Sequence, residues 1–284
     1  MPQDRDQDHD IVPLADAGLI DTLTGIVSRA AAAILTVRSG ALDTKTKPDQ
    51  SPVTAADHAS EALIIAGVAD VLPGVLVVSE EAAGRDRPHL HGTSFVLVDP
   101  LDGTRELVAG RDEFTVNLAV VNGGRPRLGI IAAPALGLVW RTAAGGGAER
   151  LRLAPGAPAE AATERTPIRP RSWPATGAVA TVSRSHLDPQ TEGFLAGLPP
   201  TQRRASGSAI KLCWLAEGLA DVYPRLAPVH EWDVAAGEAI LAAAGGQVTG
   251  SDGKPLAYGR DATGFIVPGF VAWGDPAASG RFAR

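Results

Sequence analysis

Two carboxylates close together at the end of an apolar run give the sequence its clearest chemical signal. Asp99 and Asp102 directly follow Phe95–Val98, and Pro100 and Gly103 shape the turn around them. Close carboxylates repel each other, and removing them from water is costly unless a cation compensates their charge. Oxygen ligands suit Mg²⁺, which is usually completed by water and substrate phosphate. The segment therefore predicts a metal site, with a polar turn and an Asp helix cap as the simpler alternative.

Further acidic residues stand at similar positions elsewhere in the chain. Glu80 and Glu81 follow a second apolar run, and Asp233 opens an expected helix. Taken singly, Asp233 is most simply a helix N-cap, and Asp57 a first-turn carboxylate favoured by the helix dipole. Because all of them stand at strand ends or helix starts, together they predict one shared site. No Cys or His cluster accompanies them to favour zinc, so we expect Mg²⁺.

Hydrophobic periodicity predicts helices and strands in both halves of the chain, and so a mixed α+β or α/β class. Thr54 is expected to cap the second helix, and residues 43–52 to form a loop. The first half predicts helices at 15–38 and 55–72 and strands at 75–78, 95–98, 115–121, 128–132, 137–142 and 150–153. The second half predicts a strand at 178–182, helices at 189–197, 208–220 and 234–244, and strands near Gln247 and Gly264.

A segment rich in Pro, Ala and charge, residues 155–174, separates the two halves. We therefore expect an N-terminal α+β domain over residues 11–154 that carries most of the metal-ligand candidates. A C-terminal α/β domain over residues 175–284 would carry Asp233 and the residues that bind substrate phosphate.

The composition limits function and location. The 284 residues carry a net charge of −6 and are 45% hydrophobic, which allows a substantial core. No basic run resembles a nucleic-acid footprint, so we expect no nucleic-acid polymer as partner. The single cysteine, Cys213, excludes a disulfide framework and is expected to be buried. The acid-rich start lacks a secretory signal, and no apolar run reaches the ~20 residues of a membrane span, which favours the cytoplasm.

Four motifs, taken in order, resemble those of the inositol monophosphatase superfamily of Mg²⁺-dependent, Li⁺-sensitive phosphatases. They are Ser51–Asp57, Ser79–Glu81, Asp99–Thr104 and Trp232–Glu238. The resemblance implies a layered αβαβα sandwich, which agrees with the expected elements. It also implies hydrolysis of a phosphate monoester by a metal-activated water, with no covalent nucleophile.

The resemblance implies two to three Mg²⁺ ions held by carboxylates and one main-chain carbonyl. One ion would lower the pKa of a water molecule, and another would neutralise the leaving oxygen. The first ion would be held by Glu80, Asp99 and the carbonyl of Leu101, the second by Asp99, Asp102 and Asp233, and a third, weaker one through water by Asp57.

By the same resemblance, Asp57 and Thr104 would orient and deprotonate the attacking water, with Glu80 as a further catalytic residue. Gly103, Thr104 and Asp233 would also contact the substrate.

Finer features resemble the branch of bacterial 3′(2′),5′-bisphosphate nucleotidases. Their substrate is adenosine 3′,5′-bisphosphate, a by-product of sulfate assimilation. Leu107 departs from the pattern, since the branch usually has Phe there. By this resemblance, the uncleaved 5′-phosphate would be bound by His186, Ser208, Lys211 and Arg225. The features are Lys47 and Asp49, Arg105–Glu106, Ser183–His186, Ser206–Lys211 and Tyr223–Arg225.

The residues themselves give this phosphate site partial support. Ser208 and Lys211 are three positions apart, so we expect them on one face of the 208–220 helix, near the N-terminus that favours anions. Taken alone, Lys211 fits a solvated face equally well, and His186 fits a surface or capping histidine. Arg225, between Pro224 and Leu226, is harder to explain as ordinary surface.

Two other functions stay open. An inositol monophosphatase or fructose-1,6-bisphosphatase would use the same metals, but inositol-selective members tend to have an acidic residue near the position of Arg225. A non-catalytic nucleotide-binding protein would have lost a metal ligand, and none is missing. We expect a small phosphate monoester as partner and a monomer or homodimer, and peripheral contact with the inner membrane stays open.

Overall fold

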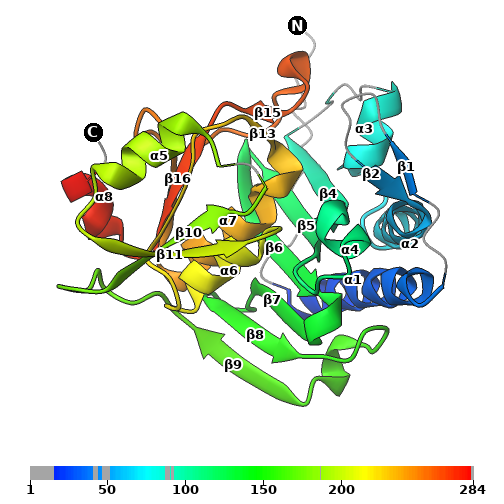
Figure 1. Ribbon diagram of the computed structural model, residues 1–284. Coiled ribbons are helices and arrows are strands. Elements are labelled where there is room, and N and C mark those ends of the chain that lie inside the picture. The colour runs from blue at the N-terminus through cyan, green and yellow to red at the C-terminus, as the bar shows by residue number, and fades with distance from the viewer. Residues whose placement is uncertain are drawn as a thin grey trace, which may run out of the picture.

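A seven-stranded sheet forms the centre of the first half of the chain (Figure 1). The computed structural model describes residues 16–40, 44–46, 52–86, 90, 93–185 and 187–282. The first two strands of the sheet pair in parallel, and all later neighbours pair antiparallel. In spatial order the strands are β3 (Leu76–Ser79), β4 (Ser94–Asp102), β5 (Thr115–Asn122), β6 (Arg125–Ala133), β7 (Leu138–Thr142), β8 (Ala148–Arg152) and β9 (Glu164–Ile168).

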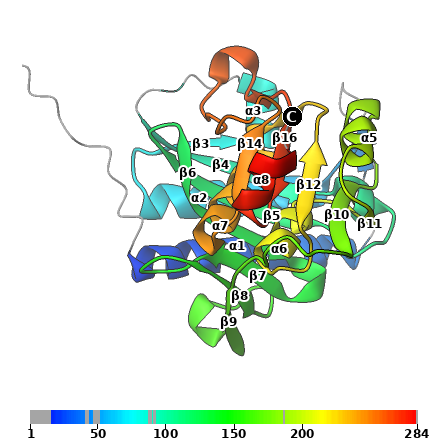
Figure 2. The ribbon, with the colours of Figure 1, turned by 90° about the vertical axis from the view of Figure 1, so that its left-hand side faces the viewer.

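A five-stranded sheet organises the second half, and Figure 2 shows it behind the C-terminal helix. In spatial order its strands are β11 (Thr201–Ser206), β10 (Ala178–Ser183), β12 (Val222–Arg225), β16 (Phe270–Trp273) and β14 (Gln247–Gly250). Two short ribbons complete the strands: β1 (Thr44–Thr46) with β2 (Pro52–Thr54), and β13 (Val229–His230) with β15 (Ile266–Val267).

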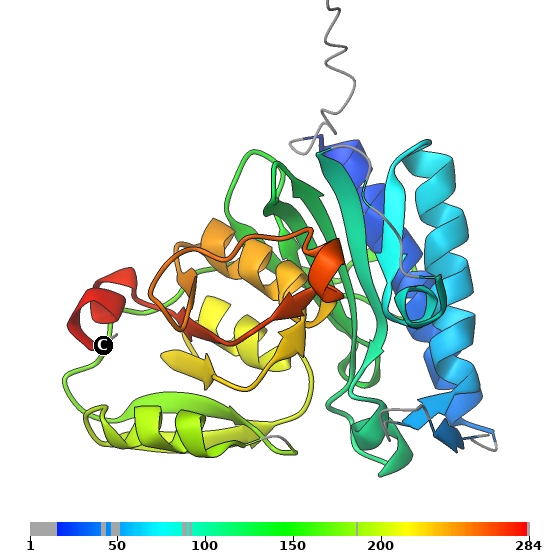
Figure 3. The same cartoon turned by 90° about the horizontal axis from the view of Figure 1, so that it is seen from above.

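Helices cover both faces of each large sheet, so the chain has five layers in αβαβα order, as expected (Figure 3). The outer layer on the seven-stranded sheet is α1 (Ala17–Arg38) and α2 (Ala55–Val71). The middle layer is α6 (Ile210–Ala216) and α7 (Ala235–Ala244), and the far layer is α5 (Pro189–Ala196) and α8 (Pro276–Phe282). Two short helices, α3 (Glu80–Asp86) and α4 (Thr104–Val108), follow β3 and β4.

Burial explains why β4 reads as a continuous apolar run rather than an alternating one. Val96 and Val98 pack with α1 and α2, whereas Phe95 and Leu97 face the middle helices. A strand covered on both faces needs apolar side chains at every position. Each of these buried side chains contributes about 1.5–3 kcal/mol by leaving water. The strand that carries Asp99 and Asp102 at its end is therefore held by apolar packing on both faces.

Two glycines let the middle helices approach their neighbours closely. A Cβ on Gly129 of β6 would lie 2.2 Å from the carbonyl oxygen of Ala236 in α7. A Cβ on Gly237 of α7 would lie 2.2 Å from a methyl carbon of Leu212 in α6. A larger residue at Gly129 would push α7 away from the seven-stranded sheet, and a larger residue at Gly237 would push α6 and α7 apart within the middle layer.

Most expected elements of the first half are confirmed, including both long helices and the cap by Thr54. Two expectations fail there. The segment 43–52 was expected to be a loop, yet it contributes β1, and residues 155–174 were expected to be only a connection, yet they contribute β9. In both cases a short polar edge strand lacks the apolar alternation that predicts strands. In the second half, β11, β12 and β16 were not predicted from the sequence.

Helix α1 has the length and apolar composition of a membrane span, alone among the described helices. Its apolar side chains, among them Leu23, Ile26 and Ile34, are buried in the core against the seven-stranded sheet. A buried core helix passes the same compositional test, so α1 is only a weak indication of membrane insertion.

Candidate active site

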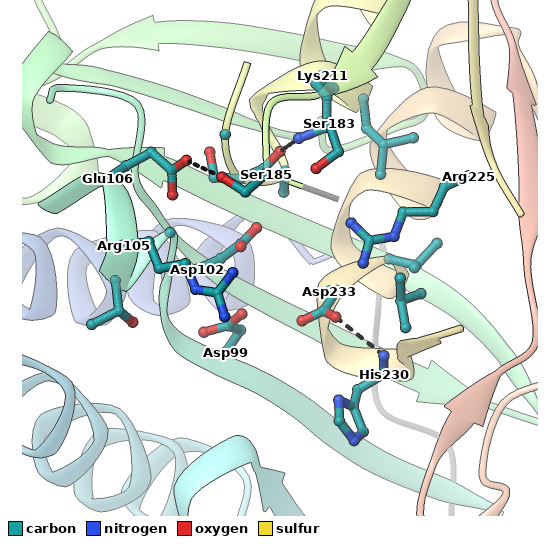
Figure 4. Close-up of a pocket in the computed structure, with 18 of the residues that line it drawn as sticks. Asp99, Asp102, Arg105, Glu106, Ser183, Ser185, Lys211, Arg225, His230 and Asp233 are labelled. Carbon is teal, nitrogen blue, oxygen red and sulfur yellow. Dashed lines mark hydrogen bonds between the residues drawn. The ribbon is translucent and has the colours of Figure 1, made fainter. Parts of the chain in front are cut away.

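Residues from both halves of the chain line one cavity of about 370 Å³. Figure 4 shows Asp99 and Asp102 at one side of it, with Asp233, Arg225 and Lys211 facing them from other elements. The cavity brings together most of the site residues that the sequence predicted: Glu80, Asp99, Leu101, Asp102, Gly103, Thr104, Ser208, Lys211, Arg225 and Asp233.

Asp57 lies behind the cavity wall and is buried in the first turn of α2. Its Oδ2 accepts hydrogen bonds from the amide of Thr54 at 2.7 Å and from Thr54 Oγ1 at 2.8 Å, which completes a capping box. Its Oδ1 accepts a 3.1 Å hydrogen bond from Thr104 Oγ1. The helix-start interpretation of Asp57 is therefore correct, and it is compatible with a role at the site.

An irregularity at the end of β4 orients its two carboxylates differently. Asp99 still pairs across the sheet with Asn117, but the register then shifts before Asp102. Asp99 Oδ1 accepts the amide of Leu101 at 3.0 Å, and Asn117 Nδ2 lies 3.4 Å from Asp102 Oδ2. Gly103 takes φ +95°, a left-handed conformation that glycine adopts at little cost. The irregularity places both carboxylates at the cavity.

Asp233 reaches the same place from the second half, in the short helix η3 (Glu231–Asp233). Its Oδ2 accepts the amide of His230 at 3.1 Å, and its carboxyl group lines the same cavity as Asp99. The expectation that Asp233 caps the next helix is wrong, because Val234 occupies that position without a side-chain cap. Glu231 is fully buried and accepts the amides of residues 259 and 260.

The carboxylates raise one another's pKa. Burial raises the pKa of Asp99 well above its ordinary value, and the charges of Glu80, Asp102 and Asp233 add to the effect. Burial and then the Asp233 charge raise the pKa of Asp102 to about 7, against the opposing charge of Lys211. Burial and then the Glu80 charge raise the pKa of Asp233 to about 6. The cluster holds more negative charge than its surroundings balance.

A hard divalent cation fits this donor set, because every candidate ligand is an oxygen. Glu80, Asp99, Asp102 and Asp233 would offer carboxylates, and Leu101 would offer a carbonyl. Within the described part of the chain, no three His, Cys, Asp or Glu side chains already form a metal-holding group. A cation would therefore suit the oxygen donors and offset the mutual repulsion of the carboxylates.

A cationic side of the cavity faces the carboxylates. The Lys211 ammonium is buried and donates hydrogen bonds to the carbonyls of Ser206 (3.3 Å) and Ser208. Burial lowers the pKa of Lys211 to about 8, whereas the charge of Asp102 opposes this. Arg225 extends from the end of β12, and its Nε is buried without a hydrogen-bond partner among the described residues. Such a donor is suited to an anionic ligand.

The expected helix face of Ser208 and Lys211 is wrong. Helix α6 begins at Ile210, and Ser208 lies before it with φ +49°, in the left-handed region. Ser208 still lines the cavity, but it does so from a tight turn whose carbonyl accepts Lys211. His186 lies outside the described residues, as do Lys47 and Asp49.

The structure adds cavity residues to which the sequence analysis gave no role. Glu106 is buried, and its Oε1 accepts Ser185 Oγ at 3.4 Å. The His230 ring stacks on Trp232, with the ring centres 4.5 Å apart and the planes 8° from parallel. Tyr223 also lines the cavity. Their proximity in sequence to Thr104, Asp233 and Arg225 was the available signal.

Comparison with known proteins agrees with this site. The family model described as the inositol monophosphatase family matches residues 17–274. The chain is 37% identical over 254 residues to the 3′(2′),5′-bisphosphate nucleotidase CysQ of Escherichia coli strain K12, covering 89% of this chain and 98% of that protein. It is 33% identical over 238 residues to the histidinol-phosphatase of Mycobacterium tuberculosis, covering 80% and 85%.

Solved structures give the same result. The crystal structure of CysQ from Bacteroides thetaiotaomicron superimposes with a TM-score of 0.74 at 32% identity, covering 90% of this chain and 96% of that one. An inositol monophosphatase of Thermotoga maritima shares the fold with a TM-score of 0.73 at 22% identity. From the family model, the curated relatives and the shared fold, we conclude that the chain belongs to the inositol monophosphatase family and is a phosphatase.

Proposed function

We propose that this phosphatase removes the 3′-phosphate from adenosine 3′,5′-bisphosphate and releases AMP and inorganic phosphate. The observation that carries the proposal is that one cavity has a negatively charged side and a positively charged side. A carboxylate cluster around Asp99 and Asp102 faces two buried or half-buried cations, Lys211 and Arg225. With Mg²⁺ held by the carboxylates, a substrate with a phosphate at each end would match this arrangement, whereas a substrate with one phosphate would leave Lys211 and Arg225 without a phosphate to bind. The bisphosphate nucleotidase among the relatives supports the same choice.

Mg²⁺ is the proposed cofactor, at two to three ions. When bound, it would lower the pKa of the attacking water and offset the negative charge that develops on the phosphate and the leaving oxygen. The residues proposed to hold it are Glu80, Asp99, Asp102, Asp233, the carbonyl of Leu101 and, through water, Asp57.

Asp57 and Thr104 are proposed to prepare the attacking water. Thr104 Oγ1 donates a hydrogen bond to Asp57 Oδ1, so its lone pairs can accept a hydrogen bond from a water molecule in the cavity. When that water loses a proton to Thr104, the hydroxyl proton of Thr104 would pass to Asp57. Asp57 is itself held in place by two hydrogen bonds from Thr54, which fixes the direction of this relay. Positioned acid–base groups of this kind contribute about 10²–10⁴ in rate. The half-buried Glu80, also proposed as catalytic, adds negative charge beside Asp99 and Asp233.

The uncleaved 5′-phosphate is proposed to bind at Ser208, Lys211 and Arg225, with His186 as a further ligand. Arg225 offers a planar pair of N–H donors that suits phosphate, and Lys211 offers a point charge. Gly103, Thr104 and Asp233 would contact the phosphate that is cleaved, since they line the cavity beside Asp102.

A second candidate is hydrolysis of a substrate with a single phosphate, such as an inositol, fructose or histidinol phosphate. The histidinol-phosphatase among the relatives favours it. A non-catalytic nucleotide-binding role is less well supported, because all five implied metal-ligating side chains are present. The test is a panel of phosphate monoesters compared by kcat/KM. Highest efficiency on adenosine 3′,5′-bisphosphate supports the proposal, and highest efficiency on a single-phosphate substrate overturns it.

The remaining properties follow from the proposed substrate and the family resemblance. A role in sulfur assimilation, a cytoplasmic location and inhibition by Li⁺ are proposals of this kind, as is assembly as a monomer or homodimer. Activity in a soluble cell fraction and the mass of the purified protein in solution would test the location and the assembly.

A further inference from the structure

A bidentate ion pair joins the two halves of the chain beside the cavity. Arg184, which follows β10, donates two hydrogen bonds to the carboxylate of Glu113, in the loop before β5. Both side chains are partly exposed, at 30% and 29%. An exposed ion pair usually adds little to the free energy of unfolding, so stability alone does not explain why this pair joins the two halves beside the cavity.

The same pair also holds the main chain of the segment Ala205–Ser208, which we call the phosphate loop. Glu113 Oε2 lies 3.5 Å from the amide nitrogen of Gly207, which donates to it. Arg184 donates from its side chain to the carbonyl of Ala205 at 3.4 Å and from its amide to that of Ser206 at 3.1 Å. The loop is thus tied to the half of the chain that carries Asp99 and Asp102.

Glu106 provides a second tie from the same half. A Cβ on Gly207 would lie 2.6 Å from Glu106 side-chain carbons, so only glycine allows the loop to pack so closely. Ser185 Oγ, next to Arg184, donates to Glu106 at 3.4 Å. Glu106 belongs to α4, which begins at Thr104. The loop therefore packs against α4, whose first residue is Thr104.

The phosphate loop in turn positions Lys211. The Lys211 ammonium donates to the carbonyls of Ser206 and Ser208, on either side of Gly207. Movement of the loop would move both carbonyls, and the ammonium with them. A chain of contacts therefore runs from Glu113 and Arg184 through the loop to Lys211.

We propose that the Glu113–Arg184 pair sets the distance between the carboxylate cluster and Lys211, and so determines selectivity for substrates with two phosphates. The inference rests on the proposed function, because it assigns Lys211 to the second phosphate. The separation of the two phosphates in a nucleotide is limited by its covalent structure, so a displaced Lys211 loses contact when the first phosphate is in place. Glu113 and Arg184 are positioning residues and do not touch the substrate.

The test is a charge-reversal cycle with two substrates. Glu113→Lys, Arg184→Glu and the double variant are compared on adenosine 3′,5′-bisphosphate and on 3′-AMP, which lacks the 5′-phosphate. Each single reversal should raise KM for the bisphosphate about fivefold to tenfold. The double variant should recover part of this loss, because it restores the ion pair between the halves but not the hydrogen bonds to Gly207 and Ala205. The kcat/KM for 3′-AMP should change by less than about twofold.

A neighbouring ion pair supplies the control. Asp112 precedes Glu113 and pairs at 2.8 Å with Arg38 of α1, away from the phosphate loop. Asp112→Asn should leave KM for both substrates unchanged. Thermal melting of each variant checks the fold, and Glu113→Gln, which keeps the shape without the charge, replaces a reversal that fails to fold and should raise KM in the same direction.

The outcomes separate this inference from the proposed function. If the unmodified protein does not prefer the bisphosphate over 3′-AMP, the proposed function fails. If it does prefer the bisphosphate, three results would overturn the positioning role alone. The single reversals could leave KM for the bisphosphate unchanged, they could lower kcat/KM equally on both substrates, or the double variant could show no rescue.

Discussion

Thr104 Oγ1 donates a 3.1 Å hydrogen bond to Asp57 Oδ1 and so joins the start of α4 to the first turn of α2. The same Asp57 caps its helix through Thr54. One carboxylate thus stabilises a helix start and polarises the hydroxyl that faces the cavity. The two roles predict different consequences when they are removed separately.

Replacing Thr104 by Ala should lower kcat by about 10²–10⁴, because the polarised hydroxyl is lost, while Thr104→Ser should retain most activity. Asp57→Asn should lower kcat by a similar factor and lower the melting temperature only slightly, since the amide oxygen can still accept the Thr54 amide.

The matched control is Asp16→Ala, which removes the cap of α1, a 2.9 Å hydrogen bond from the Gly18 amide to Asp16. It should cost about 1 kcal/mol of stability and no activity. Loss of activity in the control, or full activity of Thr104→Ala, would contradict the assignment.

Replacing Asp99 by Asn should nearly abolish turnover while the protein still folds. Burial is the largest cause of the raised pKa of Asp99, and the charges of three neighbouring carboxylates add to it. In the absence of a cation, the negative charge of Asp99 therefore destabilises the folded state. In metal-free buffer at neutral pH, the variant should therefore melt at the same or a higher temperature than the unmodified protein. Retained kcat, or collapse of the metal-free fold, would each count against a metal-bridging role.

Chelation should remove activity, and Mg²⁺ should restore it. Mg²⁺ should also raise the melting temperature of the unmodified protein, because an ion that binds only the folded state stabilises it. The same addition should have a much smaller effect on Asp99→Asn. Li⁺ at about tens of millimolar should inhibit, as expected for a small ion competing at a weak Mg²⁺ position. Full activity after exhaustive chelation would rule out the proposed cofactor.

A buried pair outside the site predicts a pH dependence of stability. Burial raises the pKa of Glu238 to about 7, although Tyr258 OH donates a hydrogen bond to it. Between about pH 4.5 and 7 the folded state keeps a proton that the unfolded state has released, so the free energy of unfolding falls as pH rises. Once the pH has risen through about 7, the contribution of the protonated Glu238 to the free energy of unfolding is lost.

Glu238→Gln should remove that contribution and keep an acceptor for Tyr258. Urea titrations should find the variant more stable than the unmodified protein by about 1–3 kcal/mol at pH 8, with the difference shrinking toward pH 4. An equal difference at both pH values would mean that the effect comes from packing rather than from ionisation.

The sequence predicted the first half of the fold better than the second, for identifiable reasons. Helices α1 and α2 carry long apolar periods and side-chain caps at Asp16 and Thr54, and both were found nearly to the residue. Strand β9 is exposed along most of its length, so no apolar pattern marked it. Helix α6 was expected to start at Ser208 but begins at Ile210. Ser208 has a left-handed backbone conformation, which a non-glycine residue rarely adopts and which the apolar periodicity does not predict.

The candidate site divides in the same way. Carboxylates next to apolar strands, such as Asp99 and Asp102, were found because burying charge at a strand end is costly and needs a reason. The sequence predicted no role for Glu106 and Glu113, because their contacts with Gly207 and Arg184 join residues that are far apart in sequence. Contacts between the halves are set by the packing of whole layers, and local patterns carry little information about them.

The most direct test of the account compares Arg225→Ala with the unmodified protein on two substrates. A charge-assisted hydrogen bond contributes about 1.5–3 kcal/mol, so the variant should lose roughly one to two decades of kcat/KM on adenosine 3′,5′-bisphosphate. Efficiency on inositol 1-phosphate should stay nearly unchanged. Arg203→Ala, which breaks only an exposed pair with Glu192 at 2.7 Å, should affect neither substrate.

Part of the loss should appear in kcat as well as in KM, because binding of the distant phosphate helps to align the one that is cleaved. A selective loss on the bisphosphate is the result that the account predicts. An equal loss on both substrates would mean that Arg225 only supports the segment before Asp233, and would contradict the assignment of this phosphatase as a bisphosphate nucleotidase.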